Sequence, residues 1–181
     1  MSLSVRPALP AALCLMLQAC IVVPVVIPGN SEGGNTANLA ALPLPGGCTR
    51  PPGAEAMQSR VLALVNAFRA DQGLRPLRAS ARIAGVAQGH ACDNAARASI
   101  DHTGSDGSTL GERLNRGGYR WWAAAENTGL GFVDSPERMV SFWQNSPNHR
   151  ANLLNPDVTE AGLGFTGGAR PTWVLNLGKP R

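Results

Sequence analysis

The chain has 181 residues, 44% of them hydrophobic, and a formal net charge of +4. This length is enough for one domain with a buried core, and no internal repeat suggests a solenoid. The arginines are scattered singly and Lys179 is the only lysine, whereas nucleic-acid binders usually gather their charge into a stripe with interleaved aromatics. We therefore expect no nucleic-acid partner, and we interpret the mild basicity as a property of the surface.

The first residues predict export. Arg6 provides a positive start, and the apolar run at residues 11–17 is shorter than the roughly 20 residues that span a bilayer. The run ends in LQAC at residues 17–20, which resembles the lipobox of bacterial lipoproteins, where the cysteine thiol is lipidated and becomes the new N-terminus. We predict a signal peptide at residues 1–19 and a lipid on Cys20. The alternative is a secreted protein that is cut elsewhere.

The segment after the leader is rich in Pro, Gly and Asn, so it cannot bury enough apolar surface to offset its ordering entropy. We predict a lipid-anchored flexible tether at residues 20–52 and one folded domain at residues 53–181. Ile21 follows the cysteine in place of the aspartate associated with retention in the inner membrane. We therefore expect a membrane-anchored lipoprotein at the outer membrane or facing the periplasm.

Cys14 lies in the predicted signal peptide and Cys20 is the predicted site of the lipid, so two cysteines remain. In an oxidising compartment outside the cytoplasm, such a pair is expected to form a disulfide. Cys48 and Cys92 lie too far apart for a metal site of the CxxC type. We predict a structural disulfide that pins the end of the tether to a helix and contributes about 4 kcal/mol.

The first half of the domain indicates helices. Apolar residues recur at helical spacing from Glu55 onward, and Gly73 ends that helix. Ser80 caps a second helix, in which a stripe of small residues would allow close packing against a neighbour. Thr109 and Glu112 stand in capping-box spacing and start a third, short helix. The stripe of the second helix consists of Ile83, Ala87, Ala91 and Ala95.

The second half of the domain indicates mainly strands. Residues 119–126 carry three aromatics and predict a strand, and Ser135 followed by Pro136 predicts the start of a further helix. Alternating apolar residues at 161–165 and at 173–177 flank a Gly-containing loop and predict a β-hairpin. Because helices dominate the first half of the domain sequence and strands the second half, we expect an α+β fold.

The polar residues with chemical potential are the histidines and one glutamate. His90 lies on the buried stripe of the second helix, and we interpret it as a histidine at the edge of the core with one hydrogen bond. His102 and His149 lie in polar, irregular stretches, where binding residues are commonly displayed. Glu126 ends an apolar, aromatic run, so its carboxylate needs a hydrogen-bonding partner such as a histidine. The sequence therefore predicts a polar site that contains His102, Glu126 and His149.

Five segments, taken together and in order, resemble the CAP superfamily, which comprises cysteine-rich secretory proteins, antigen 5 and pathogenesis-related protein 1. The segments are LVNAFR at residues 64–69, DHTG at 101–104, AEN at 125–127, FWQNSPNHRAN at 142–152 and GLG at 162–164. They match best the bacterial branch, and the resemblance covers nearly the whole domain. It implies a three-layer α-β-α sandwich with a cleft that holds two histidines and two acidic residues.

Matched by position, the resemblance makes His102 and His149 the two histidines of the cleft and Glu126 its first acid. The second acid is replaced by Ser146, three residues after Trp143, so the cleft has one negative charge fewer. In some relatives the two histidines bind zinc or another divalent metal, which makes His102 and His149 the expected metal ligands. The missing acid lowers the expected affinity for such a cation.

Several functions are compatible with these residues. We expect a non-enzymatic binding module for a small or lipidic ligand, or for a partner in the cell envelope, because the family is associated with such roles. The alternative is a metal-dependent, protease-like envelope hydrolase in which Glu126 joins the two histidines as a third ligand. A triad of Ser146, His149 and Glu126 lacks a visible oxyanion hole and a sharp nucleophile turn. A purely structural envelope protein would leave the cleft idle. We expect the tryptophans to lie in the core rather than in a ligand groove: Trp121, Trp122, Trp143 and Trp173.

Overall fold

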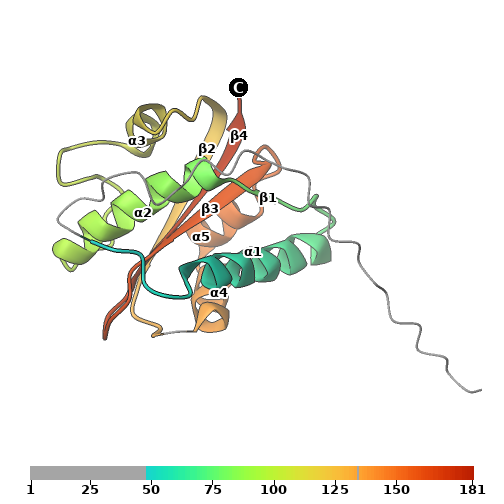
Figure 1. Ribbon diagram of the computed structural model, residues 1–181. Coiled ribbons are helices and arrows are strands. Elements are labelled where there is room, and N and C mark those ends of the chain that lie inside the picture. The colour runs from blue at the N-terminus through green and yellow to red at the C-terminus, as the bar shows by residue number, and fades with distance from the viewer. Residues whose placement is uncertain (1–47, 134) are drawn as a thin grey trace, which may run out of the picture. The chain divides into compact units, whose positions relative to one another are not determined.

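A computed structural model describes residues 48–133 and 135–181 (Figure 1). The elements are α1 (Ala54–Asp71), β1 (Arg78–Ala79), α2 (Ala81–Ala96), α3 (Leu110–Arg116), β2 (Trp121–Leu130), α4 (Pro136–Asn145), α5 (Pro147–Leu153), β3 (Glu160–Phe165) and β4 (Thr172–Pro180). The predicted signal peptide, the lipid on Cys20 and most of the predicted tether lie outside the described residues. Within that part of the chain, no helix combines the length and the apolar character needed to cross a membrane.

The four strands form one mixed sheet in the order β1-β3-β4-β2. The predicted hairpin is confirmed, because β3 pairs antiparallel with β4 through Leu163 and Leu175. β4 also pairs antiparallel with β2, and the short β1 runs parallel to β3. β2 is therefore an edge strand of the sheet, although it comes from the middle of the chain.

Helices cover both faces of this sheet, so the predicted three-layer α-β-α sandwich is confirmed. On one face, Ala87 and Ala91 of α2 pack against Val174 of β4. On the other face, α1 and α4 bury their apolar stripes against the alternate residues of the same strands, in a cluster that includes Val65, Met139, Trp143, Leu163 and Leu175. Figure 1 shows α2 on one side of the strands and α1 with α4 on the other. Burial of this apolar surface is the main force that holds the layers together.

The glycines of β3 explain how closely α2 approaches the sheet. A Cβ atom built on Gly162 would lie 2.2 Å from the backbone nitrogen of Ala84, and one on Gly164 would lie 2.2 Å from the carbonyl carbon of Ala87. Neither position has room for any side chain. The small residues predicted to allow close packing in α2 thus meet a strand that presents no side chain at the points of contact.

Most predicted element ends are confirmed. The side chain of Ser80 accepts a hydrogen bond from the backbone of Ile83, and Thr109 forms a complete capping box with Glu112. The side chain of Ser135 likewise caps α4.

Two details of the predicted elements are wrong. The strand begins at Trp121 rather than at residue 119, because Tyr119 belongs to a small core cluster, where its hydroxyl donates to Glu160 Oε2 at 3.1 Å. Ala95, at the end of the predicted stripe of α2, is exposed, so the buried face of that helix ends before it.

The tryptophans divide between core and surface. Trp143 and Trp173 are fully buried, as expected for core residues, whereas Trp122 is 63% exposed. Trp121 is half-buried and packs against a cluster that includes Leu114. The expectation of a core position is therefore wrong for Trp122.

The predicted disulfide joins Cys48 and Cys92, with their Cα atoms 5.8 Å apart. Cys92 is buried within α2, so the bond ties the residues that precede α1 to the middle of the helix layer.

Candidate functional site

The carboxylate of Glu126 lies at the centre of the site, on the edge strand β2, and the residue is only 5% exposed. Its Oε1 atom is 3.0 Å from Nδ1 of His102, and its Oε2 atom accepts a hydrogen bond of 2.8 Å from Nη2 of Arg113. Each oxygen of the buried carboxylate therefore has a partner. A buried carboxylate needs such partners, because its desolvation is otherwise very costly.

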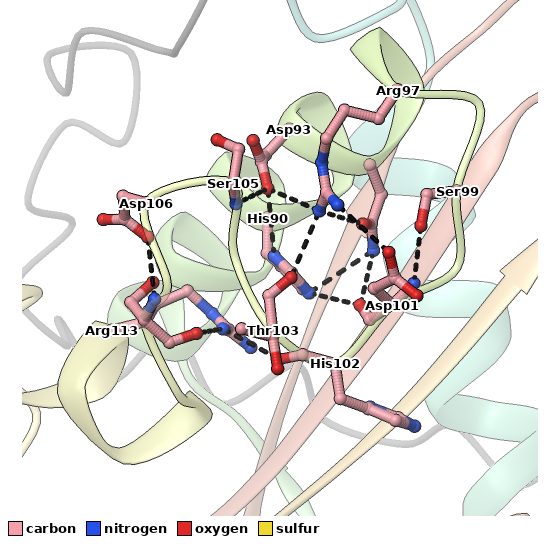
Figure 2. A network of polar contacts seen from close by, with 12 residues as sticks. His90, Asp93, Arg97, Ser99, Asp101, His102, Thr103, Ser105, Asp106 and Arg113 are labelled. Carbon is pink, nitrogen blue, oxygen red and sulfur yellow. Dashed lines mark hydrogen bonds and ion pairs between the residues drawn. The ribbon is translucent and has the colours of Figure 1, made fainter.

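Arg113 also holds the backbone of the loop that carries His102. Its Nη1 atom donates to the carbonyl oxygens of His102, at 3.0 Å, and of Ser108, at 2.8 Å. Figure 2 shows the guanidinium of Arg113 reaching this loop. Since the capping box at Thr109 sets the start of α3, the same local signal positions Arg113, one turn further along that helix.

A second arginine fastens the loop to α2. Arg97 donates to the carboxylates of Asp93 and Asp101, at 2.9 and 3.0 Å, and to the carbonyl oxygen of Thr103, at 3.1 Å. Asp93 in turn accepts a hydrogen bond of 2.9 Å from the backbone of Ser105. These contacts converge in Figure 2 between the end of α2 and the loop. The loop of His102 is thus held at several points by charge-assisted hydrogen bonds.

His90 lies behind this site, with a fully buried side chain. The sequence predicts a histidine with one hydrogen bond, and its Nε2 atom lies 2.8 Å from the carbonyl oxygen of Asp101. The same nitrogen is 3.7 Å from Oε1 of Glu126, so His90 also approaches the central carboxylate. Asn94, one turn later, donates to the same Asp101 carbonyl at 2.9 Å.

His149 belongs to α5, on the other side of β2. Its carbonyl oxygen accepts a hydrogen bond of 3.1 Å from the side chain of Asn127. Asn152 donates at 3.1 Å to the carbonyl oxygen of Glu126 and at 2.9 Å to the side chain of Asn127. Two asparagines therefore tie α5 to the edge strand beside Glu126. The ring of His149 packs 5.6 Å from that of Phe142, between ring centres, and its Nδ1 atom is buried without a partner among the described residues.

The structure brings His102 and Glu126 together and leaves Ser146 apart from them. Ser146 occupies the N-cap position of α5, but its side chain makes no capping hydrogen bond. The carboxylate of Glu126 bonds to His102 and Arg113, and the ring of His149 makes no hydrogen bond to Ser146 or Glu126. In the described part of the chain, the arrangement of a serine–histidine–glutamate triad is therefore absent.

Comparison with known proteins identifies the domain. The family model described as "CAP: Cysteine-rich secretory protein family" matches residues 62–177, which is most of the described structure.

The chain belongs to the CAP family.

Curated relatives of this CAP domain come from Bacillus subtilis (strain 168). The chain is 30% identical over 138 residues to the uncharacterized protein YkwD, a match that covers 76% of this chain and 49% of YkwD. It is 35% identical over 107 residues to the uncharacterized membrane protein YlbC, covering 59% of this chain and 31% of YlbC. The chain thus spans half or less of the length of these relatives.

Solved structures share the CAP fold. An extracellular protein of Bacillus anthracis with an SCP domain superposes with a TM-score of 0.65 at 26% identity, over 72% of this chain and 44% of that one. An outer surface protein from Borrelia burgdorferi superposes with a TM-score of 0.66 at 23% identity, over 74% of this chain and 99% of that one. At that identity the second likeness shows the fold alone.

The two histidines of this CAP site differ in their electrostatics. The hydrogen bond to Glu126 raises the pKa of His102 above its ordinary value, against the opposing effect of burial. Burial lowers the pKa of His149, and the nearby His102 lowers it further. Burial also lowers the pKa of His90, although Glu126 partly offsets the effect. His102 therefore holds a proton at a higher pH than either of the other two.

The donor set of the CAP cleft does not fit the three-ligand zinc site that the residue types allowed. Both oxygens of Glu126 are already bonded, and the Arg113 cation lies 2.8 Å from one of them. Among the residues that the structure describes, no group of three or more His, Cys, Asp or Glu side chains is placed to hold a metal ion. His102 and His149 as a pair of metal ligands remain a prediction.

Sequence reasoning missed Arg113 and the approach of His90 to Glu126. Arg113 stands in a short helix whose other charged residues are exposed, so nothing in the local pattern separates it from a surface arginine. The capping box just before it fixes the start of α3 but not which face of that helix is buried. Asn127 and Asn152, which join α5 to β2, lay within the family segments but were given no role.

Proposed function

We propose that this CAP domain is an exported binding module that takes up a small or lipidic ligand, or a component of the cell envelope, without turning it over. The ligand would contact the outer edge of His102, the accessible face of His149 and the aromatic surface next to them. Function varies widely within a fold family. The proposal therefore rests mainly on the burial and hydrogen bonding of Glu126, and less on membership of the family.

The observation that carries the proposal is the burial of the Glu126 carboxylate, with a partner on each of its oxygens. A general base or a third metal ligand needs a carboxylate oxygen that can reach the substrate or the ion. Here one oxygen is bonded to His102 and the other to Arg113, and the side chain is only 3% exposed. Because it is buried and bonded on both oxygens, the carboxylate faces the histidine and the arginine and is not presented to a reacting group. The side chain of His102, in contrast, is 60% exposed.

An open groove beside His149 supports a ligand with an apolar part. The groove has a volume of about 520 Å³ and is lined by Phe132, Glu137, Arg138, Ser141, Phe142 and Asn145. The ring of Phe142 is 43% exposed and lies between those of Phe132 and His149, at 5.5 and 5.6 Å. An apolar surface with a few polar groups at its rim is the usual composition of a small-molecule site. A ligand with an anionic group at His102 and an apolar body over Phe142 would satisfy both parts.

Export and a lipid anchor on Cys20 are part of the same proposal. The relatives include a membrane protein, an extracellular protein and an outer surface protein. The disulfide between Cys48 and Cys92 supports an oxidising compartment. The lipid itself is tested by mass spectrometry of the mature N-terminus, which should show a diacylated or triacylated cysteine. An unmodified start at another residue would contradict the lipoprotein proposal and leave the binding proposal standing.

The binding proposal is tested with a probe that combines apolar rings with one anionic group, such as anilinonaphthalene sulfonate, and with oleate as a competitor. The fluorescence of the bound probe should rise on the wild-type chain and be unaffected by a chelator. Phe142→Ala and His102→Gln should each weaken binding about tenfold, because one removes an aromatic contact and the other a charge-assisted hydrogen bond. Arg75→Gln, an exposed charge on another part of the domain, serves as the control.

The same preparation distinguishes binding from hydrolysis. Envelope peptides and lipids incubated with the wild-type chain should be recovered intact by mass spectrometry. Cleavage that is lost on chelation and in His102→Gln would replace the binding proposal with the metal-dependent hydrolase. Probe binding that neither substitution weakens would remove His102 and Phe142 from the site.

A further inference from the structure

A second feature of the surface lies at the start of β2 and involves the exposed Trp122. The pairing of β2 with β4 shifts register between Trp121 and Ala123, so Trp122 has no partner residue in the ladder. A bulge of this kind turns one side chain away from its normal place on the sheet. Trp121 packs inward against the core, whereas Trp122 is 63% exposed. The backbone thus displays a large aromatic ring to solvent.

Three basic residues lie near Trp122 in the chain or in the strand ladder, and one of them contacts its ring. The guanidinium of Arg181 lies over the indole, 4.4 Å from the ring centre, and the backbone nitrogen of Arg181 donates to the carbonyl oxygen of Arg120 at 3.0 Å. Lys179 pairs with Ala123 in the ladder, next to the bulge. Basic residues are scattered singly along the sequence, and the antiparallel pairing of β2 with β4 brings the backbones of these three close together. We refer to Arg120, Trp122, Lys179 and Arg181 as the Trp122 surface.

The basic side chains of the Trp122 surface have no acidic side-chain partner within the described structure. Arg120, Lys179 and Arg181 form no such ion pair there, whereas Arg78, Arg97, Arg113 and Arg116 each do. On the neighbouring strand β3, Glu160 pairs with Gly178, the residue before Lys179. That carboxylate already accepts hydrogen bonds from Arg78 and Tyr119. The surface therefore combines an exposed indole with basic side chains that have no acidic side-chain partner in the described structure.

We propose that the Trp122 surface docks the domain on an anionic membrane. Tryptophan is enriched at the membrane–water interface, where its ring enters the headgroup region and its N–H stays hydrated. Each cation near an anionic leaflet strengthens binding about fivefold. A protein partner is a poorer fit, because one exposed ring and three cations offer little of the apolar area of a stable interface.

This docking surface is independent of the proposed ligand site. Glu126 lies four residues beyond Trp122 on the same strand, which is about 13 Å at the rise of a β-strand. Within the described structure, the hydrogen bonds and ion pairs given for His102, Glu126 and His149 involve no residue of the Trp122 surface. Failure of either proposal therefore leaves the other intact.

Quenching of Trp122 by vesicles with brominated acyl chains tests the proposal on the full chain. The chain has 4 tryptophans, all in the folded domain, and only Trp122 is exposed. Whatever else holds the chain to a vesicle, quenching reports whether this ring enters the bilayer. We expect quenching with phosphatidylglycerol in the vesicles, little with phosphatidylcholine alone, and loss of the signal in Trp122→Phe. Equal quenching on both vesicle types, or an undiminished signal in Trp122→Phe, would overturn the proposal.

A matched pair of charge variants tests the electrostatic part. Arg120→Gln with Lys179→Gln removes two cations from the surface and should weaken docking about 30-fold. Arg75→Gln with Arg170→Gln removes the same charge from exposed positions elsewhere and should leave docking unchanged. If both pairs of substitutions weaken docking equally, docking depends only on net charge and the proposal is overturned. Binding to heparin that depends on Arg120 and Lys179, without quenching by vesicles, would instead identify a soluble polyanion as the partner.

Discussion

Arg113 and Glu126 form an ion pair that is almost completely buried, with Nη2 2.8 Å from Oε2 and side chains that are only 8% and 3% exposed. The other oxygen of Glu126 bonds to His102, and the other arm of Arg113 holds the His102 backbone. The position of the exposed histidine therefore depends on an arginine that no ligand needs to touch. This connection is the basis of the first two predictions.

Arg113→Met should destabilise the domain by about 3 kcal/mol, because it leaves the Glu126 carboxylate buried without its charged partner. Arg116→Met is the matched control, since its ion pair with Asp106 is largely exposed and should contribute nothing measurable. Chemical denaturation monitored by tryptophan fluorescence measures both. If the two variants unfold at the same denaturant concentration, the buried pair does not have the structural role assigned to it.

The histidines should titrate at clearly different pH values in chelator-treated protein. The pKa of His102 is raised by its bond to Glu126, and those of His90 and His149 are lowered mainly by burial. At a pH between the pKa values of His149 and His102, His102 is an imidazolium and His149 is a neutral imidazole. NMR titration of the ring protons should show His102 losing its proton last as pH rises. Glu126→Gln should bring the His102 pKa down, and an unchanged value would contradict the assigned cause.

The same shifts predict opposite effects of pH on stability. The contribution of His102 to the free energy of unfolding is fully present below the unfolded pKa of about 6.5, and it is lost as pH rises through the raised pKa of the folded state. The contribution of His149 is present above about pH 6.5, and it is lost as pH falls through the lowered pKa of the folded state. Thermal unfolding from mildly acidic to mildly basic pH, compared with that of His102→Gln and His149→Gln, separates the two. Loss of the same pH dependence in both variants would contradict the assignment.

Gly164→Ala should destabilise the domain by about 3 kcal/mol or prevent folding, since the new Cβ would overlap the backbone of Ala87. Gly89→Ala in α2 is the control, because a Cβ there has nothing within 4 Å and alanine favours a helix. That variant should be stabilised by about 0.5–1 kcal/mol. Circular dichroism during thermal unfolding distinguishes the two outcomes. A tolerated Gly164→Ala would mean that α2 and β3 are less closely packed than described.

Removal of the disulfide by Cys48→Ser with Cys92→Ser should cost up to about 4 kcal/mol, because the bond closes a 44-residue separation in the unfolded chain. Reduction of the wild-type chain should have the same effect as the double substitution. A loss of less than about 1 kcal/mol would indicate that the unfolded chain gains little freedom without the bond.

Local sequence signals were reliable guides to the elements of this domain. The caps at Ser80, Thr109 and Ser135 and the hairpin of alternating residues lie where expected, because each depends on contacts between near neighbours in sequence. The exposure of Trp122 could not be predicted in the same way. It depends on a shift of register against β4, whose residues come some fifty positions later in the chain.

The candidate site was partly predictable for a similar reason. His102, Glu126 and His149 were singled out by residue type, by their irregular or apolar surroundings and by resemblance to a family. Their partners were not, because Arg113 and His90 resemble ordinary helical residues until the loop of His102 folds back over α2 and α3.

The sequence alone thus predicts which segments are helices or strands, where most of them start, the family of the domain and the pairing of Cys48 with Cys92. Periodicity, capping and turn chemistry act over a few residues, and they need no knowledge of the rest of the fold. The three-dimensional packing decides which polar atoms meet. It pairs the Glu126 carboxylate with His102 and Arg113, and it places Arg181 over the ring of Trp122. Long-range contacts of this kind depend on the order of strands and the positions of helices in space, which local composition does not encode.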